Sequence, residues 1–169
     1  MPSYEEIKLQ PLTAEAFAPF GQVLDCSGQP TVIINAGLCQ RFSDLVDVDI
    51  IDGAKGEVGQ AGVSIFKSQL RSLPYKLDLL ERHPLGSQAF LPLSHDGFLV
   101  IAAPDAGGTP GRPLAFLSQP GQGINFARNT WHGVLTPLSG SGLFAVVDRI
   151  GLGDNLEEAP LQAPYLIVE

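Results

Sequence analysis

Tyr75-Lys76-Leu77-Asp78-Leu79-Leu80-Glu81-Arg82-His83 is the stretch of this sequence from which the architecture is best inferred. Its alternation of apolar and polar side chains predicts a β-strand, in which every second residue lies on the same face. On that strand, Glu81 and His83 lie on the face occupied by the leucines at 77 and 79. Burying either group without a partner costs on the order of several kcal/mol, so we expect a metal, a substrate or a hydrogen-bonding network beside them. This face is the predicted active site.

The rest of the chain also consists of short apolar runs. Nineteen glycines and fourteen prolines separate these runs, which indicates turns between strands and disfavours long helices. Strands are predicted at residues 30–35, 62–67, 77–83, 87–93, 97–103, 114–117, 123–127 and 142–150. One short helix is predicted over residues 14–18, with Thr13 as its N-cap. The pattern predicts a mainly β fold, either a barrel or a two-sheet sandwich, in a single domain that spans residues 1–169.

Two segments next to each other differ from this alternation. The run Phe98–Ala103 is apolar at every position, so it is either an interior strand or a strand covered by another subunit. The following residues, 104–113, are rich in Gly and Pro and show no periodicity, which indicates a flexible excursion.

Composition restricts the class of protein. At 169 residues and 17.9 kDa the chain is long enough for one domain with a substantial core. The net charge of −8 and the pI near 4.7 oppose binding to a phosphate backbone. No apolar stretch approaches the roughly 20 residues that span a bilayer. We therefore expect neither nucleic acid nor a membrane as a partner.

Two further features indicate the cellular compartment. Residues 1–8 carry acids before any apolar run, which is the wrong polarity for a secretory signal or a transit peptide. Cys26 and Cys39 are the only cysteines in a chain large enough to fold without a disulfide, so reduced thiols are expected. Both observations favour the cytoplasm.

A second group of polar residues follows a Gly-rich turn. Residues 121–133 include Arg128, Trp131 and His132 in an otherwise apolar stretch, and such loop clusters are often functional. His132 is either a core histidine satisfied beside Trp131 or a partner of His83 in a site. His95 lies in a predicted hairpin turn, where we expect it to be solvated.

These two groups together resemble the motifs of the cupin barrels. Glu81-Arg82-His83 followed by Gln88 is similar to the first cupin motif, and His132 is similar to the histidine of the second. Glu81 stands where a histidine is usual, and Gln88 where a glutamate is usual. An amide oxygen is a poorer metal ligand than a carboxylate.

The chain also resembles one family over most of its length, from about residue 8 to the C-terminus. The matching motifs are residues 81–90, Asn-Xaa-Gly at 35–37 with Arg41, Arg-Asn-Thr-Trp-His at 128–132, and Asp148-Arg149 with Gly153-Asp154-Asn155. They are similar to the ureidoglycolate lyase family, which cleaves ureidoglycolate to glyoxylate and urea in allantoin breakdown. The resemblance implies a cupin-like β-barrel, a homodimer and a divalent metal, with nickel favoured.

The resemblance and the chemistry of this substrate imply a set of site residues. Glu81, His83, Gln88 and His132 are the expected catalytic group, and His83, Gln88 and His132 are the expected metal ligands. The expected substrate-binding residues are Asn35, Arg41, Ser64, Arg128 and Arg149. An arginine suits the substrate carboxylate, because its guanidinium makes a bidentate contact. The identity of the general base, Glu81 or a histidine, stays open.

Alternative interpretations remain at this point. In a regular strand Arg149 faces away from Asp148, and Arg82 faces away from Glu81 and His83, so each arginine has a structural or interfacial reading. Serine-nucleophile hydrolysis is disfavoured because no Gly-Xaa-Ser-Xaa-Gly motif surrounds a serine. The rival functions are an amidohydrolase that releases ammonia from ureidoglycolate, and a cupin-like protein that binds a small carboxylate without converting it.

Overall fold

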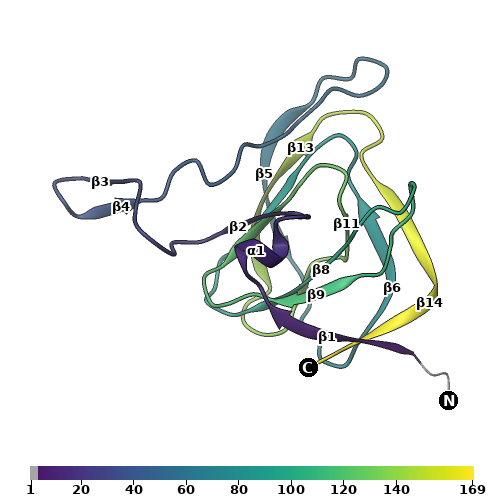
Figure 1. Cartoon of the computed structure of the whole chain (residues 1–169). Helices are drawn as coiled ribbons and strands as arrows, with labels where there is room; N and C mark the ends of the chain where they lie inside the picture. The colour runs from purple at the N-terminus through teal and green to yellow at the C-terminus, as the bar shows by residue number, and fades with distance from the viewer. Residues whose placement is uncertain (1–3) are drawn as a thin grey trace.

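The computed structural model describes residues 4–169 and consists of two large sheets and a small hairpin (Figure 1). The first sheet has the strand order β11 (Trp131–His132), β6 (Tyr75–Arg82), β14 (Glu157–Val168), β1 (Glu5–Pro11), β9 (Leu114–Leu117), β8 (Phe98–Ala103) and β12 (Thr136–Pro137). The second has the order β2 (Gly21–Leu24), β10 (Gly123–Phe126), β7 (Gln88–Pro92), β13 (Leu143–Ile150) and β5 (Gln60–Lys67). The hairpin joins β3 (Val32–Ile34) to β4 (Cys39–Arg41).

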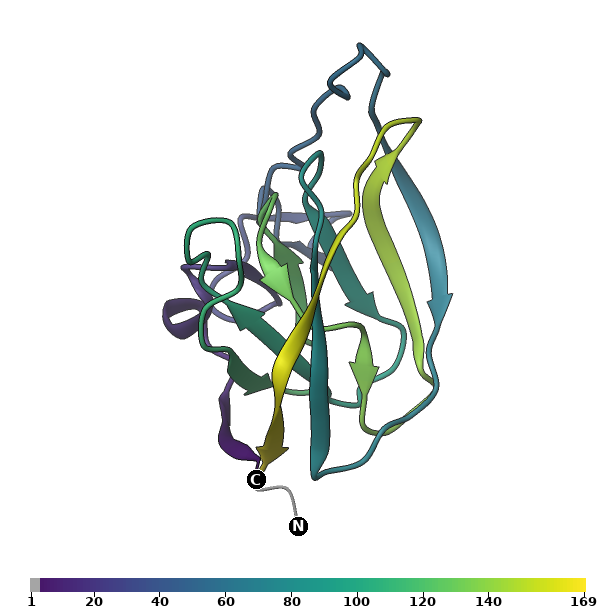
Figure 2. The ribbon, with the colours of Figure 1, turned by 90° about the vertical axis from the view of Figure 1, so that its right-hand side faces the viewer.

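The first sheet closes on itself. Because β11 pairs with both β6 and β8, the strands from β11 to β8 form a closed barrel. β1 runs parallel to β14 and β9, whereas the other pairs in this barrel are antiparallel. Figure 2 shows β14 beside β6 in the middle of the view and β13 beside β5 at its right edge. The predicted mainly β, cupin-like barrel is confirmed.

Two hydrophobic cores divide the interior. One core fills the closed barrel and takes its side chains from β1, β6, β8, β9, β11 and β14. The other lies between the outside of β8 and β9 and the inner face of the five-stranded sheet. Phe98, Val100 and Ala102 belong to the second core, and the alternate residues of β8 belong to the first. The apolar run 98–103 is therefore an interior strand covered on both faces by its own chain.

The predicted short helix is present as α1 (Ala14–Phe17). Thr13 caps it, since the Ala16 backbone N–H donates to Thr13 Oγ1 at 3.1 Å. The helix buries Phe17 completely, and this ring meets Phe116 edge-on with centroids 5.7 Å apart. α1 thus covers one end of the core between the sheets.

The expected alternation along β6 needs one correction. Leu77 does not share a face with Glu81 and His83, because it packs with Leu80 in the core of the closed barrel. The register of the neighbouring strand β14 shifts between Pro160 and Tyr165, opposite this part of β6. Such irregularities increase the local twist of a strand pair, so strict alternation fails there. The carboxylate and the imidazole nevertheless share one face.

The structure describes both loops on which the sequence analysis made a prediction. His95 is exposed in the turn between β7 and β8, as expected. Residues 104–113, predicted as a flexible excursion, contain an isolated bridge between Asp105 and Pro110. The Asp105 carboxylate also accepts hydrogen bonds from the Gly108 backbone N–H and from Trp131 Nε1. Within residues 4–169, no helix has the length and apolar character needed to cross a membrane.

Candidate active site

The predicted carboxylate and imidazoles come together on one face of the β6–β11 pair. Glu81 and His132 are directly opposite one another in this antiparallel pairing, so their side chains lie on the same face. His83 follows immediately after β6, and its ring centroid is 5.2 Å from that of His132. One ligand atom from each of Glu81, His83 and His132 lies within 4.8 Å of the other two. This arrangement has the geometry of a metal-binding triad.

Hydrogen bonds determine which ring nitrogen of each histidine carries the proton. His83 Nδ1 lies 2.7 Å from the Asn155 carbonyl oxygen, and His132 Nδ1 lies 2.9 Å from that of Gly133. Since a carbonyl oxygen only accepts hydrogen bonds, Nδ1 is the donor in both neutral rings and Nε2 has a lone pair. Both Nε2 atoms are buried and have no hydrogen-bond partner among the described residues. Two lone pairs therefore face a common space, as metal ligation requires.

His132 is held as a neutral imidazole by burial. Its side chain is 1% exposed and stacks on Phe126, with ring centroids 4.2 Å apart and planes 10° apart. Burial lowers its pKa to about 3, while the Gly133 carbonyl opposes the shift and nearby His83 adds to it. Protonation does not compete with ligation near neutral pH, so His132 is available as a ligand.

Glu81 has the opposite tendency. Burial raises the pKa of its carboxyl group, His83 opposes this shift, and the neighbouring Glu158 carboxylate reinforces it. A carboxyl group with a raised pKa accepts and returns a proton near neutral pH more readily than an exposed one. Glu81 therefore has the properties of a general base as well as those of a ligand.

Gln88 contributes an amide from the facing sheet. It lies opposite Phe126 in the β7–β10 pairing, so it shares the inner face with the ring that stacks on His132. Its Nε2 donates to Asp148 Oδ2 at 3.0 Å. This bond orients the amide and leaves Oε1 buried, with no partner within the part of the chain that the structure describes. Asp148 thus presents the oxygen of Gln88 to the space between the sheets.

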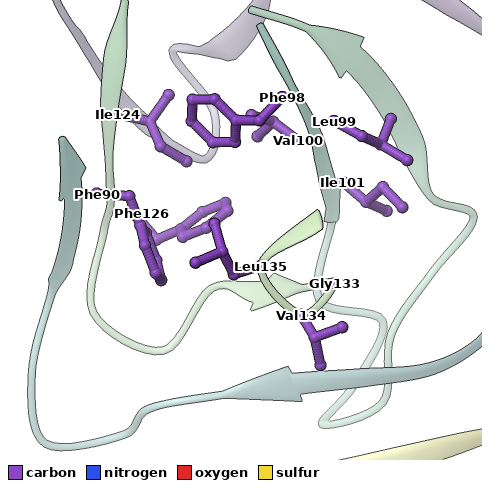
Figure 3. A pocket seen from close by; sticks show the side chains of 10 residues that line it. All are labelled: Phe90, Phe98, Leu99, Val100, Ile101, Ile124, Phe126, Gly133, Val134 and Leu135. Carbon is purple, nitrogen blue, oxygen red and sulfur yellow. The ribbon is translucent and has the colours of Figure 1, made fainter. Parts of the chain in front are cut away.

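A small apolar cavity adjoins this polar group. Phe126 separates the two, since it lines the cavity and stacks on His132. Figure 3 shows that Phe98, Ile124, Phe126 and Leu135 point toward one another, whereas Leu99 and Ile101 lie on the other side of β8. The full lining is Phe90, Phe98, Leu99, Val100, Ile101, Ile124, Phe126, Gly133, Val134 and Leu135. Apolar side chains therefore border the triad on the side of Phe126.

The predicted substrate-binding residues are dispersed. Arg128 is exposed, pairs with Asp49 at 2.9 Å and donates to the Pro84 carbonyl oxygen, next to His83. Ser64 is half-buried opposite Val146, on the inner face of β5. Asn35 and Arg41 are exposed on the β3–β4 hairpin. Arg128 thus contacts the segment that carries His83.

Arg149 lies on the opposite face of β13 from Asp148. Its guanidinium donates to four backbone carbonyl oxygens, those of Ile51, Glu57, Gly151 and Leu152. It is 8% exposed, and these bonds tie the segment before β5 to the turn after β13. This set of contacts is that of a structural arginine.

Arg82 lies on the face away from the triad, as the alternation indicated. Its guanidinium pairs with Glu157 at 2.6 Å and with Asp105 at 3.1 Å. It also lies over the Trp131 ring at 4.3 Å from the centroid. Arg82 therefore locks β6, β11 and β14 together behind the site.

Sequence reasoning assigned no role to three residues that shape the site. Asn155 accepts from His83 through its carbonyl and from the Leu85 backbone N–H through Oδ1 at 2.7 Å. Asp148 orients Gln88, and Phe126 stacks on His132. Asn155 and Asp148 occur in the motifs that resemble the family, which was the available signal. Nothing in the sequence indicated that Phe126 stacks on His132.

Comparison with known proteins adds to this geometry. A family model described as ureidoglycolate lyase matches residues 4–168. A ureidoglycolate lyase of Rhodobacter capsulatus is 56% identical over 96% of this chain and 98% of its own length. One from a Chelativorans species is 51% identical over 96% of both chains. The protein named ureidoglycolate lyase 2 of Rhizobium meliloti is 46% identical over 95% of this chain and 96% of its own.

Proposed function

The chain belongs to the ureidoglycolate lyase family, and from this premise we propose that it is a lyase that cleaves ureidoglycolate to glyoxylate and urea. The observation that carries the proposal is the convergence of Glu81, His83 and His132 in the space between the two sheets. On the facing sheet, the Gln88 amide oxygen is buried and has no partner among the described residues. Such a buried set of acceptors requires a cation or a hydrogen-bonding substrate.

The donor set fits a divalent metal. Two neutral imidazole nitrogens with oxygen donors suit nickel, manganese, iron or zinc, and nickel is our proposal because the family resemblance favours it. His83, His132 and the Gln88 amide oxygen would hold the ion, with the Glu81 carboxylate beside them. When bound, a divalent cation supplies positive charge that stabilises the negative charge developing on the substrate oxygen.

The substrate chemistry assigns a role to Glu81. Ureidoglycolate carries a carboxylate, a hydroxyl and a ureido nitrogen on one carbon. Elimination removes the hydroxyl proton, forms the carbonyl of glyoxylate, breaks the carbon–nitrogen bond and adds one proton to the departing nitrogen. Glu81 takes the hydroxyl proton and returns it to the nitrogen, so that protons balance over the reaction. The raised pKa of its carboxyl group suits this transfer.

The carboxylate of the substrate needs a cationic partner. We propose that Arg128 binds the substrate carboxylate, because its guanidinium donates to the Pro84 carbonyl oxygen, beside His83 of the same chain. Arg149 uses its donors on backbone carbonyls, so we propose that it positions the chain around the site. Ser64 lines the inner face of β5 and would contact substrate only deeper between the sheets.

We also propose that the single domain acts as a cytoplasmic homodimer. The family resemblance supports the homodimer. Both cysteines carry free thiols, which fits the reducing environment of the cytoplasm.

A product assay tests the proposed reaction. Purified protein is incubated with racemic ureidoglycolate, and glyoxylate, urea and ammonia are measured together, with and without a chelator. We expect glyoxylate and urea in equal amounts and a loss of rate with chelator, reversed by added nickel. Ammonia in place of urea would instead identify an amidohydrolase. Absence of all products, combined with stabilisation by glyoxylate, would identify a binding protein.

A further inference from the structure

The β3–β4 hairpin projects from the body of the molecule as an arm, here defined as residues 30–42 (Figure 1). Its two strands pair only with each other among the described residues. The Thr31 backbone N–H donates to the Arg41 carbonyl oxygen at 2.8 Å and closes the base of the arm. A two-stranded hairpin by itself is marginally stable in water. The arm therefore needs a surface on which to pack.

The composition of the arm indicates an apolar contact. Val32, Ile33 and Ile34 are all exposed, and Leu38 at the tip is 89% exposed. Arg41 is the one charged residue between positions 26 and 43, in a chain with a net charge of −8. An exposed apolar group of this size that carries little charge is typical of a protein interface.

The arm is not packed tightly on its own subunit. Between the arm and the five-stranded sheet lies a hollow whose lining includes Ile34 and Phe42 from the arm side and Leu24 and Leu91 from the sheet. The hollow shows that the arm stands off from β2 and β7 instead of covering them.

The same sheet has an uncovered apolar outer face. On β5, Ser64 and Phe66 point inward, so Val63 and Ile65 point outward, and Val63 is 73% exposed. Leu91 of β7 is exposed on the same face, which is continuous across β13 because Ala145 lies opposite both Ile65 and Leu91. One chain thus carries two apolar surfaces, the arm and this face, and they adjoin at the hollow that Ile34 and Leu91 line.

We propose that the arm of each chain docks on the outer face of the five-stranded sheet of a second copy, in a reciprocal exchange. A two-fold dimer requires that both complementary surfaces be present on one chain, and the arm and the face meet this condition. The single charge of the arm, on Arg41, is also opposite in sign to the net charge of −8 of the chain that would receive it. The inference rests on the proposed homodimer but not on the proposed lyase activity.

The exchange would also place Asn35 and Arg41, which are remote from the triad of their own chain. Both residues lie on the arm, so in the proposed dimer they contact the surface of the other copy.

Three single substitutions, and a mixture of two of the variants, test the exchange. L38D alters the arm, V63D alters the face, and L152D is the matched control at a position that is 80% exposed in the turn after β13. Sedimentation equilibrium is measured over a range of concentrations. We expect wild type and L152D to be dimers, and the dimer dissociation constants of L38D and V63D to rise at least tenfold. Equal dissociation constants for all variants, or a monomeric wild type, would overturn the proposal.

Mixing distinguishes exchange from a contact between like surfaces. A heterodimer of L38D and V63D retains one intact arm on one intact face, whereas each homodimer of these variants has none. We expect the mixture to dimerise more tightly than either variant alone. A mixture no tighter than its components would contradict reciprocal docking.

Hydrogen exchange on wild-type protein is a second test that does not depend on any substitution. The amides of residues 30–42 should gain protection as the protein concentration rises through the dimer dissociation constant. Protection that does not change with concentration would contradict an arm buried between copies.

Discussion

The two faces of the β6–β11 pair differ in how their polar groups are satisfied. On one face, His83 Nε2 and His132 Nε2 lack partners within residues 4–169, although they are buried. On the other, Arg82 bonds two carboxylates and lies over Trp131, whose Nε1 donates to Asp105 at 2.9 Å. Arg82 and Trp131 therefore differ in role from His83 and His132, their neighbours in sequence. Satisfied polar groups stabilise the barrel, and unsatisfied ones identify the site.

The largest effect is expected from removing a histidine of the triad. H132A deletes one Nε2 lone pair, so metal affinity should fall and kcat/KM should drop by about a thousandfold, or about 4 kcal/mol. Metal content after dialysis and steady-state kinetics measure both effects, and circular dichroism monitors the fold. W131F, one residue away on the other face, is the matched control. An H132A enzyme with full activity would remove His132 from the site.

Substitution of Glu81 should separate catalysis from ligation. E81Q keeps the size of the side chain but cannot accept the hydroxyl proton, so kcat should fall by about a hundredfold. Because His83 and His132 are unchanged, the bound metal should be retained. Equal losses of metal and activity in E81Q would instead show that Glu81 acts mainly as a ligand.

The pH dependence of stability tests the environment of His132. Its pKa is lowered to about 3 in the folded protein, whereas in the unfolded chain it is near the usual 6.5. Between these values the unfolded state binds more protons, so the free energy of unfolding falls as pH decreases through this window. Glu81 has a raised pKa and acts in the opposite direction.

The H132Q variant lacks the histidine contribution to this pH dependence. Urea titrations of metal-free protein should show wild type losing about 2 kcal/mol more than H132Q between pH 7.5 and pH 5. Equal losses would indicate a solvated His132.

A smaller effect is expected at Asp148. D148A removes the acceptor that orients the Gln88 amide, and we expect kcat/KM to fall about tenfold. D148N keeps an oxygen acceptor and should retain most of the activity. If both variants had wild-type kinetics, the orientation of Gln88 would not matter for the reaction.

The smallest effect on activity is expected behind the site. R82M keeps an apolar stem over Trp131 but loses the bonds to Glu157 and Asp105. The free energy of unfolding should fall by about 1 to 3 kcal/mol, while kcat stays within about threefold of wild type. A large loss of kcat without loss of stability would show that the two faces are coupled.

Several features could be predicted before the structure was known. Short apolar runs between glycines and prolines indicated a β fold, because few other structures accommodate so many turn residues. The fully apolar run 98–103 indicated an interior strand. β14 was not predicted, since Pro160 and Pro164 disfavour a strand, and the structure accommodates this region with the register shift before Tyr165.

The candidate site was foreseen in part. Glu81 and His83 could be placed together because strand periodicity acts over two residues. The resemblance to a family linked them to His132 and Gln88. Their local chemistry could not be read from the chain, since the orientation of the Gln88 amide depends on Asp148, which is 60 residues away in sequence. The tautomer of His83 likewise depends on Asn155.

The sequence alone was enough to determine the mainly β class, the family and the residue types of the site, because these follow from local periodicity and motif order. The pairing of β6 with β11, the separate covering of the two faces of β8, and the projection of the arm were decided only by the tertiary structure. These features depend on contacts between distant segments, and the burial of His132 follows from them. Trp131 and His132 are neighbours on β11, but the tertiary structure gives them different surroundings. His132 is buried where it stays neutral, and Trp131 lies where it stabilises the barrel.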